Sequence, residues 1–260
     1  MEIVNVPALS IAGMIFSLLI SVGVPALLAY LAYKKLRASI KSMFVGAVTF
    51  IVFALILEQI FHVVMGNVFG NALTNNIWIR GVYGGLAAGV FEEIGRYLAM
   101  KFVIKNDLSK ENSIMYGVGH GGIEAIIIAG LAAASNIVVS VLINTGRFEA
   151  TLSTLTDEVR EQTITQISAL WTSPSYVFFL SGIERLSAIA IHICFSYLVY
   201  LAVKNKKVYF FFIAILLHAI FDFSAVVLAE LSTAIVVEIV LIVMAGLLSF
   251  IVYTKYKKEQ

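Results

Sequence analysis

Long apolar segments alternate with short polar ones along nearly the whole chain. An α-helix needs roughly 20 apolar residues to cross the hydrocarbon core of a bilayer, and each of these segments is long enough. Proline, which disrupts the interior of a helix, occurs only three times. The pattern predicts seven membrane-spanning helices, at residues 7 to 33, 42 to 65, 79 to 103, 113 to 140, 173 to 203, 208 to 229 and 233 to 253.

Composition supports the same structural class. Of the 260 residues, 60% are hydrophobic and 13% are charged, and the mean hydropathy is +0.96. These values exclude an ordinary soluble domain and favour an all-α, polytopic transmembrane helix bundle, formed by one domain over residues 1–260. The single cysteine, Cys194, excludes an intrachain disulfide and a cysteine-rich zinc site. The sequence carries no signature of nucleic-acid binding.

The 18 basic residues are distributed unevenly between the loops. Thirteen of them form four clusters, at residues 34–41, 101–110, 204–207 and 255–258. The loops in between hold only Arg80, Arg147 and Arg160. Because cytoplasmic loops are enriched in Lys and Arg, we expect the amino terminus outside and the carboxy terminus in the cytoplasm. The protein is then a multi-pass protein of the cell membrane, with the bacterial cytoplasmic membrane as the expected location.

The longest polar segment lies within residues 141–172. The predicted topology places this segment on the extracytoplasmic side. Its charged residues are typical of a solvated helix or cap, and a lid that controls access of substrate is the alternative.

Four of the predicted spans carry ionisable side chains within apolar sequence. These residues are Glu92, Glu93 and Arg96; His120 and Glu124; Glu184, Arg185 and His192; and His218 and Asp222. An ionisable group near the bilayer centre costs roughly 2.5 to 3.5 kcal/mol on insertion scales, so such groups usually face one another or a wet cavity. We therefore expect a catalytic core within residues 79–229.

Helix geometry predicts that these residues share one depth. Glu93, His120, His192 and His218 lie 8 to 12 residues from the nearest basic cluster, or roughly 12 to 18 Å along a helix. Small residues form a row at Gly81, Gly85 and Gly89 in the third span, and a matching row at Gly117, Gly121, Ala125 and Ala129 in the fourth. Since such rows allow close packing, we expect the third and fourth spans to meet and bring their polar residues together.

Carboxylates and histidines in one dry layer indicate metal-assisted hydrolysis. Catalytic zinc binds imidazole and carboxylate groups, keeps one position for water and activates that water for attack. Other hydrolytic designs fit less well. An aspartyl dyad needs two buried aspartates, but only Asp222 lies within a span, and there is neither a glycine-flanked serine turn beside a histidine nor an HExxH helix.

Four motifs support a family resemblance. They are Phe91-Glu92-Glu93-Ile94-Gly95-Arg96-Tyr97, Gly117-Val118-Gly119-His120-Gly121-Gly122-Ile123-Glu124-Ala125, Glu184-Arg185 with His192, and His218-Ala219-Ile220-Phe221-Asp222. Together they resemble the YhfC family of bacterial intramembrane metalloproteases, which is related to PrsW and to the CAAX-protease and bacteriocin-processing group. The resemblance extends from about Phe91 to Asp222.

The resemblance implies a metal-dependent peptidase that cleaves a membrane protein or peptide substrate at or within the bilayer. The implied catalytic residues are Glu92, Glu93, Arg96 and Asp222. The implied ligands of zinc, or of another divalent metal, are Glu93, His120, Glu124, His192 and His218. Glu92 is expected to activate water. Prenyl-protease relatives have a histidine as the principal residue of the second motif, so the choice between His120 and Glu124 as ligand stays open.

Two other functions use the same residues. In a proton- or ion-coupled transporter they would form a relay, although no broken helix or clear inverted repeat is evident. In a noncatalytic membrane scaffold they would support only assembly. Glu58 and His62, one turn apart in the second span, are expected to form a structural pair, with a supporting role at the site as the alternative.

Overall fold

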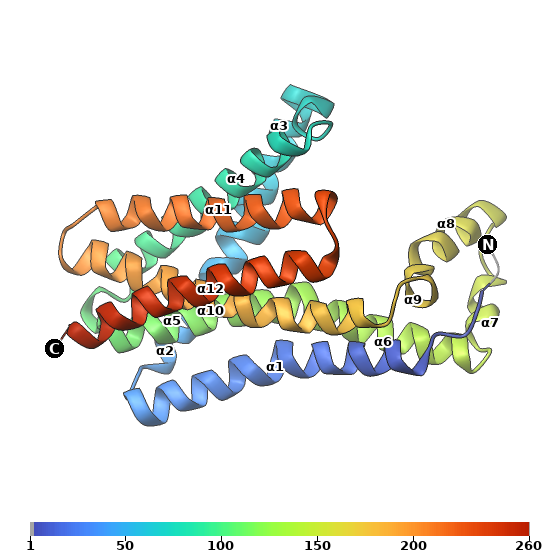
Figure 1. Cartoon of the computed structure of the whole chain (residues 1–260), viewed down its shortest axis with the longest axis horizontal. Coiled ribbons are helices and arrows are strands. Elements are labelled where there is room, and N and C mark those ends of the chain that lie inside the picture. The colour runs from blue at the N-terminus through green and yellow to red at the C-terminus, as the bar shows by residue number, and fades with distance from the viewer. Residues whose placement is uncertain (1–2, 260) are drawn as a thin grey trace. The chain divides into compact units, whose positions relative to one another are not determined.

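The computed structural model describes residues 3–259, and all regular elements of that part are helices (Figure 1). The first half contains α1 (Ala8–Leu36), α2 (Ile40–Phe50), η1 (Ile51–Glu58), α3 (Gln59–Phe69), η2 (Gly70–Leu73), α4 (Ile77–Leu98), η3 (Ala99–Val103), η4 (Lys105–Asp107) and α5 (Lys110–Ala125). The second half contains η5 (Ile126–Gly130), α6 (Leu131–Asn144), α7 (Phe148–Leu152), α8 (Asp157–Ile167), α9 (Ala169–Thr172), α10 (Tyr176–Lys204), α11 (Tyr209–Leu231) and α12 (Ala234–Lys258). The all-α prediction is confirmed.

Six helical segments of the described chain are long and apolar enough to cross a membrane. They are Ala8–Leu36, Ile40–Leu73, Lys110–Asn144, Tyr176–Lys204, Tyr209–Leu231 and Ala234–Lys258. The remaining predicted span coincides with α4 and η3, whose 22 and 5 residues are also long enough but carry more charge, including Glu92, Glu93 and Arg96. The helices therefore agree with about seven spans, while the orientation of the termini stays a prediction.

A side-chain cap explains where α4 begins, and three segments of the chain are π-helical. The Asn76 side-chain oxygen accepts hydrogen bonds from the backbone N–H groups of Trp78 and Ile79, at 2.9 and 3.2 Å, and so caps α4. The segments η1, η3 and η5 are π-helical. π-helical turns within α-helices are frequent at functional sites, and η1 ends at Glu58.

The chain forms two compact units. Unit 1 comprises the described residues up to Gly23 together with Ala125–Arg185. Its core contains Phe148, Leu152, Ile164 and Leu170, which belong to the short helices α7, α8 and α9. The polar segment at residues 141–172 is thus helical and has a buried apolar face, as expected of a cap. Its extracytoplasmic location stays a prediction.

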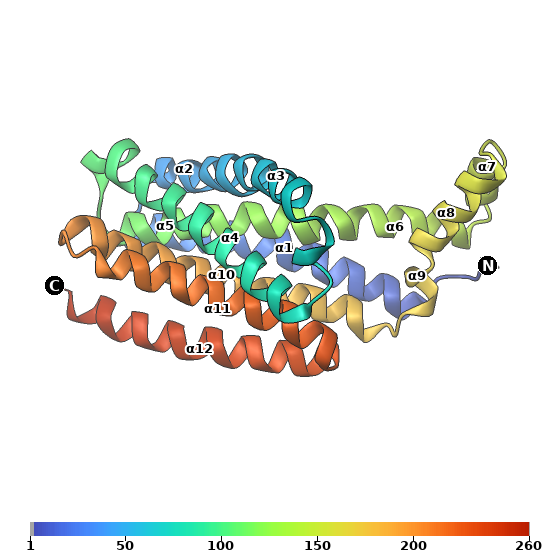
Figure 2. The same ribbon diagram turned by 90° about the horizontal axis from the view of Figure 1, so that it is seen from above.

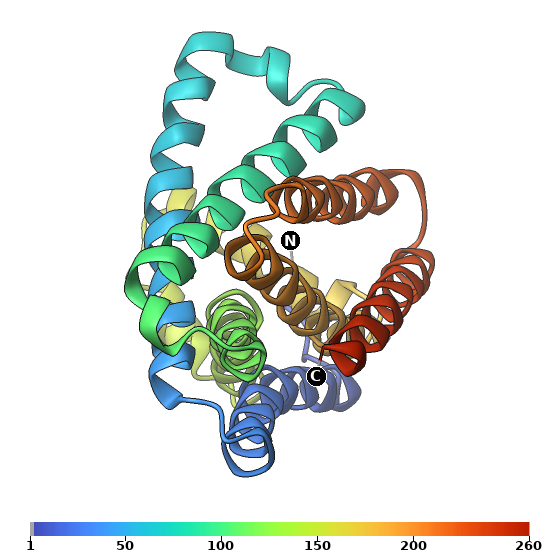
Figure 3. The ribbon, with the colours of Figure 1, turned by 90° about the vertical axis from the view of Figure 1, so that its left-hand side faces the viewer.

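Unit 2 comprises Val24–Glu124 and Leu186–Gln260, of which residues up to 259 are described. In this unit α11 lies between α4 and α12, and α4 lies between α11 and the segment formed by α2 and η1 (Figures 2 and 3). The part of α10 that belongs to unit 2 is the most enclosed, with Phe195, Tyr197 and Val199 fully buried. The helices that carry the polar motifs therefore surround a common interior.

The two glycine rows pack closely, but against helices other than those expected. A Cβ atom at Gly85 would lie 2.4 Å from the carbonyl oxygen of Ala219, so this row of α4 contacts α11. A Cβ atom at Gly117 would lie 2.6 Å from the Cα of Ile193, so the row of α5 contacts α10. The expectation that the rows themselves pack α4 against α5 is wrong, because the α4 row faces the backbone of α11 and the α5 row faces that of α10. The two helices nevertheless meet through polar residues, since Glu92 Oε2 lies 2.7 Å from His120 Nε2.

Candidate metal centre

Four helices of unit 2 bring the predicted polar residues into one layer. α4 supplies Glu92, Glu93 and Arg96; α5 supplies His120 and Glu124; α10 supplies His192; and α11 supplies His218 and Asp222. The ring centroid of His192 lies 4.9 Å from that of His120 and 5.3 Å from that of His218. Glu93, Arg96 and His120 have no exposed surface. The predicted polar residues therefore lie close together, while their depth in a membrane stays a prediction.

Glu92 lies at the centre of the cluster and is itself buried. Its Oε2 atom is 2.7 Å from Nε2 of His120, a hydrogen-bond distance, and 3.9 Å from Nδ1 of His192. Its Oε1 atom is 3.9 Å from Nε2 of His218. One carboxylate thus faces all three histidines.

Two further carboxylates hold the opposite ring nitrogens. Glu93 Oε1 lies 2.9 Å from Nδ1 of His218, and Glu124 Oε2 lies 2.5 Å from Nε2 of His192. The other nitrogen of each of these two rings lies 3.9 Å from Glu92, and on His192 this nitrogen also lies 3.1 Å from Nη2 of Arg96. A carboxylate beside one ring nitrogen fixes the tautomer and orientation of a metal-binding histidine.

Arg96 contacts residues of both α4 and α10. Its Nε atom lies 3.1 Å from Glu93 Oε2, and its Nη1 donates to the backbone oxygen of His192 at 2.7 Å and to Ser196 Oγ at 2.5 Å. A buried charge requires such a partner and several hydrogen bonds. Ser196 was not predicted, although its place one turn after His192 puts both residues on the same face of α10.

Glu92, His192 and His218 fit the donor set of a metal ion. All three are buried, and each offers one ligand atom such that the three atoms lie within 4.8 Å of one another. Tetrahedral zinc with bonds of about 2.0–2.1 Å separates its ligand atoms by about 3.3 Å, so the three donor atoms, which lie within 4.8 Å of one another, must move closer together when a metal binds. Metal binding by His192 would require one existing contact to be lost. Arg96 Nη2 lies 3.1 Å from Nδ1 of His192, and this contact must open for that nitrogen to bind metal.

Asp222 is the most exposed member of the cluster. The side chain of Asp222 is 36% exposed, and its Oδ2 lies 3.6 Å from Nε2 of His218. Glu58, at the end of η1, lies close enough to Asp222, His218 and Glu92 to interact electrostatically with them. Asp222 is therefore the exposed member of the cluster, whereas Glu92, His192 and His218 are buried.

Glu58 is held by a hydrogen-bonded chain that reaches α4. His62 Nε2 lies 3.2 Å from Glu58 Oε1, and His62 Nδ1 lies 2.6 Å from the hydroxyl oxygen of Tyr83. The expected Glu58–His62 pair is present, and its nearness to the site favours the supporting role. Tyr83 gave no signal in the sequence.

The expected site residues thus divide into donors and supporting groups. Glu92, expected to activate water, lies with His192 and His218 in the donor set. Glu93 and Glu124, expected as ligands, each lie beside a histidine of that set, and His120 lies beside Glu92. Glu184 and Arg185 form an ion pair with each other in unit 1.

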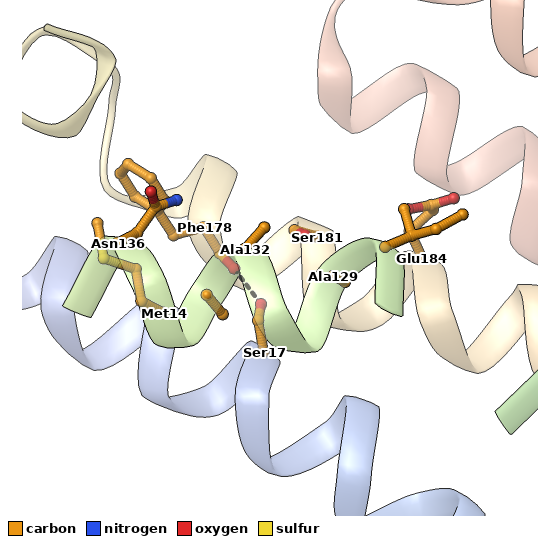
Figure 4. A pocket seen from close by; sticks show the side chains of 10 residues that line it. Met14, Ser17, Ala129, Ala132, Asn136, Phe178, Ser181 and Glu184 are labelled. Carbon is orange, nitrogen blue, oxygen red and sulfur yellow. Dashed lines mark hydrogen bonds between the residues drawn. The ribbon is translucent and has the colours of Figure 1, made fainter. Parts of the chain in front are cut away.

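A small cavity in unit 1 lacks the donors for such chemistry (Figure 4). It has a volume of about 110 Å³ between α1, α6 and α10, and Ser17, Asn136, Ser181 and Glu184 supply its polar lining. The Ser17 hydroxyl donates to the backbone oxygen of Phe178 at 2.5 Å. With one carboxylate and no histidine in its lining, this cavity lacks the donor set that Glu92, His192 and His218 form in unit 2.

Comparison with known proteins agrees with the geometry. The model of the family described as YhfC intramembrane metalloprotease matches residues 17–242, a range that includes every residue of the cluster. The chain belongs to the YhfC family. Its similarity to the uncharacterized membrane protein YhfC of Bacillus subtilis (strain 168) is 42% identity over 219 residues, which cover 82% of this chain and 84% of that protein. No solved structure matches the chain significantly.

Proposed function

We propose that this YhfC-family chain is an intramembrane metal-dependent peptidase that hydrolyses peptide bonds at or within the bilayer. The buried donor set of Glu92, His192 and His218 is the observation that carries the assignment. Nitrogen and oxygen donors in this combination suit zinc, although another divalent metal can use the same groups. The substrate class is a membrane protein or peptide, and the location is the bacterial cytoplasmic membrane.

The supporting residues keep the donors in place. Glu93 orients His218, Glu124 orients His192, and His120 orients Glu92 through hydrogen-bond or ion-pair distances of 2.5 to 2.9 Å. A bound metal supplies polarisation of the scissile carbonyl and activation of water. The chain supplies the fixed geometry, since such supporting contacts commonly contribute 10–100-fold to metal affinity or activity.

Asp222 is the residue that we assign to proton transfer. It is the exposed carboxylate beside the metal-facing nitrogen of His218, so entering water reaches it. As the water oxygen bonds to the carbonyl carbon, Asp222 accepts a proton from that water. It then donates this proton to the amide nitrogen as the carbon–nitrogen bond breaks, which releases a free amine and a carboxylic acid.

These roles differ from those implied by the sequence resemblance, in which Glu92 activates water. The distances support the change. The Glu92 carboxylate lies 3.9 Å from a ring nitrogen of both His192 and His218, and its Oε2 atom is also hydrogen-bonded to His120. Metal content separates the two assignments. Glu92→Gln loses the metal if Glu92 is a ligand, but keeps it and loses only cleavage if Glu92 activates water.

Proteolysis in a reconstituted membrane tests the function. The purified full chain is placed in liposomes with a bacterial membrane-protein extract, and mass spectrometry identifies new amino termini. We expect new termini in or beside apolar segments, and their loss with 1,10-phenanthroline or in His218→Ala. An absence of new termini with the metal-loaded protein would contradict the peptidase. Solute movement across sealed vesicles would then support a transporter, and neither activity would support a scaffold.

A further inference from the structure

A basic pocket lies in unit 2 at the end of three long helices. Its volume is about 300 Å³, and the turn between α10 and α11 and the end of α12 enclose it. In that turn Lys206 has a φ of 54°, and the N–H of Lys207 donates to the backbone oxygen of Ala202 at 3.1 Å. This turn directs the chain back at the start of α11, so that residues of three helices line one cavity.

The charges in this pocket are unbalanced. Lys207, Lys255 and Lys258 line it together with one acid, Glu259. The carboxylate of Glu259 accepts hydrogen bonds from the hydroxyls of Tyr197 and Tyr200, at 2.7 and 2.9 Å. None of the three lysines forms an ion pair with a residue of the described chain, whereas Lys41, in another cluster, pairs with Asp107 at 3.2 Å.

Apolar stripes lead from the pocket along two helices. On α11, Tyr209 lines the pocket, and Phe212 and Leu216 continue the same face at steps of three and four residues. On α12, Leu247 and Ile251 precede Lys255 and Lys258 on one face at similar steps. These five apolar side chains, Tyr209, Phe212, Leu216, Leu247 and Ile251, are each more than half exposed. In a membrane-spanning helix such faces contact acyl chains.

We propose that this pocket binds the phosphate headgroup of an anionic phospholipid. The three lysines contact the phosphate, and the acyl chains lie along the exposed stripes of α11 and α12. A soluble phosphate could contact the three lysines, but it has no acyl chain to lie along the apolar stripes. The site is independent of the metal centre, so it stands whether or not the chain is a peptidase.

Lipid titration of the full chain in a neutral detergent tests the site. Native mass spectrometry measures binding of dioleoyl-phosphatidylglycerol and dioleoyl-phosphatidylcholine to the wild type, to a pocket variant (Lys207→Gln, Lys255→Gln, Lys258→Gln) and to a control variant. The control, Lys34→Gln, Lys35→Gln, Lys105→Gln, removes the same charge from exposed lysines outside the pocket. We expect the pocket variant to bind the anionic lipid at least about tenfold more weakly, since each lysine near a membrane surface contributes on the order of 1 kcal/mol.

Two results would overturn the site. An equal loss in the control variant would assign binding to general surface charge, and full competition by glycerol 1-phosphate would assign it to a soluble anion. A triple Lys→Arg variant keeps the positive charges and must therefore keep the preference for the anionic lipid. This result would show that the lysines themselves are not needed for the protein to fold. If the triple Gln variant fails to fold, Lys207→Gln and Lys258→Gln are measured singly, and unchanged binding in both counts against the site.

Discussion

Glu93 Oε1 lies 2.9 Å from Nδ1 of His218, which leaves the other ring nitrogen directed at Glu92. We expect Glu93→Gln to weaken metal binding by roughly 10–100-fold, because the neutral amide no longer fixes the imidazole as a carboxylate does. Competitive titration against a fluorescent zinc chelator measures this affinity. Unchanged affinity in a folded variant would exclude the orienting role, and abolished binding would favour Glu93 as a direct ligand.

Arg96 should be important for stability as well as for the site. Arg96→Ala leaves Glu93 buried without its cation, and we expect a loss of about 3–5 kcal/mol in unfolding free energy. Arg160→Ala is the matched control, because Arg160 pairs with Glu149 at an exposed position and such pairs contribute about 1 kcal/mol or less. Thermal unfolding in detergent compares them. Equal melting temperatures for the two variants would contradict the structural role of Arg96.

Neighbouring glycines of α4 should differ sharply in their tolerance of a methyl group. A Cβ at Gly85 would lie 2.4 Å from the Ala219 carbonyl oxygen, whereas a Cβ at Gly84 would meet no atom within 4 Å. We expect Gly85→Ala to cost about 1–3 kcal/mol through overpacking against α11. Gly84→Ala should be neutral or slightly stabilising, since alanine favours helix. If both variants melt at the same temperature, α4 and α11 do not approach as closely as described.

Much of the fold follows from the sequence, because long apolar segments leave few alternatives to membrane helices. Six of the seven predicted spans meet the criteria of length and apolarity, and α4 deviates because it carries the site. That the histidines of three different helices lie close together was also predictable, by counting residues from the basic clusters. Which helices pack against each other was not predictable from the sequence. The glycine row ending at Gly89 could pack on any neighbour, and nothing in a single sequence indicates that this neighbour is α11.

The roles within the site were less predictable than its membership. Which nitrogen of His192 faces Glu92, and which faces Glu124, depends on helix rotation by a fraction of a turn. Ser196 and Tyr83 have no charge and occur in apolar sequence, so their hydrogen bonds to Arg96 and His62 became visible only in three dimensions. The family resemblance narrowed the list of candidate site residues but did not predict these contacts.

Removal of the Tyr83 hydroxyl should weaken catalysis without loss of metal. Tyr83→Phe deletes the hydrogen bond that holds His62 and, through it, Glu58 near Asp222 and His218. We expect cleavage to fall by about 2–10-fold, the range that corresponds to one hydrogen bond of 0.5–1.5 kcal/mol. Tyr30→Phe, at an exposed tyrosine of α1, is the control. Cleavage equal to that of the control would exclude a role for this chain of contacts.

Metal analysis of the purified protein tests the central claim most directly. The wild type is prepared without chelator and compared with the double variant His192→Ala, His218→Ala by inductively coupled plasma mass spectrometry. We predict about one equivalent of divalent metal per wild-type chain and close to none in the double variant, because two of the three donors are then missing. A folded wild type that holds no divalent metal after incubation with zinc, or a double variant that holds as much as the wild type, would contradict a metal centre at Glu92, His192 and His218.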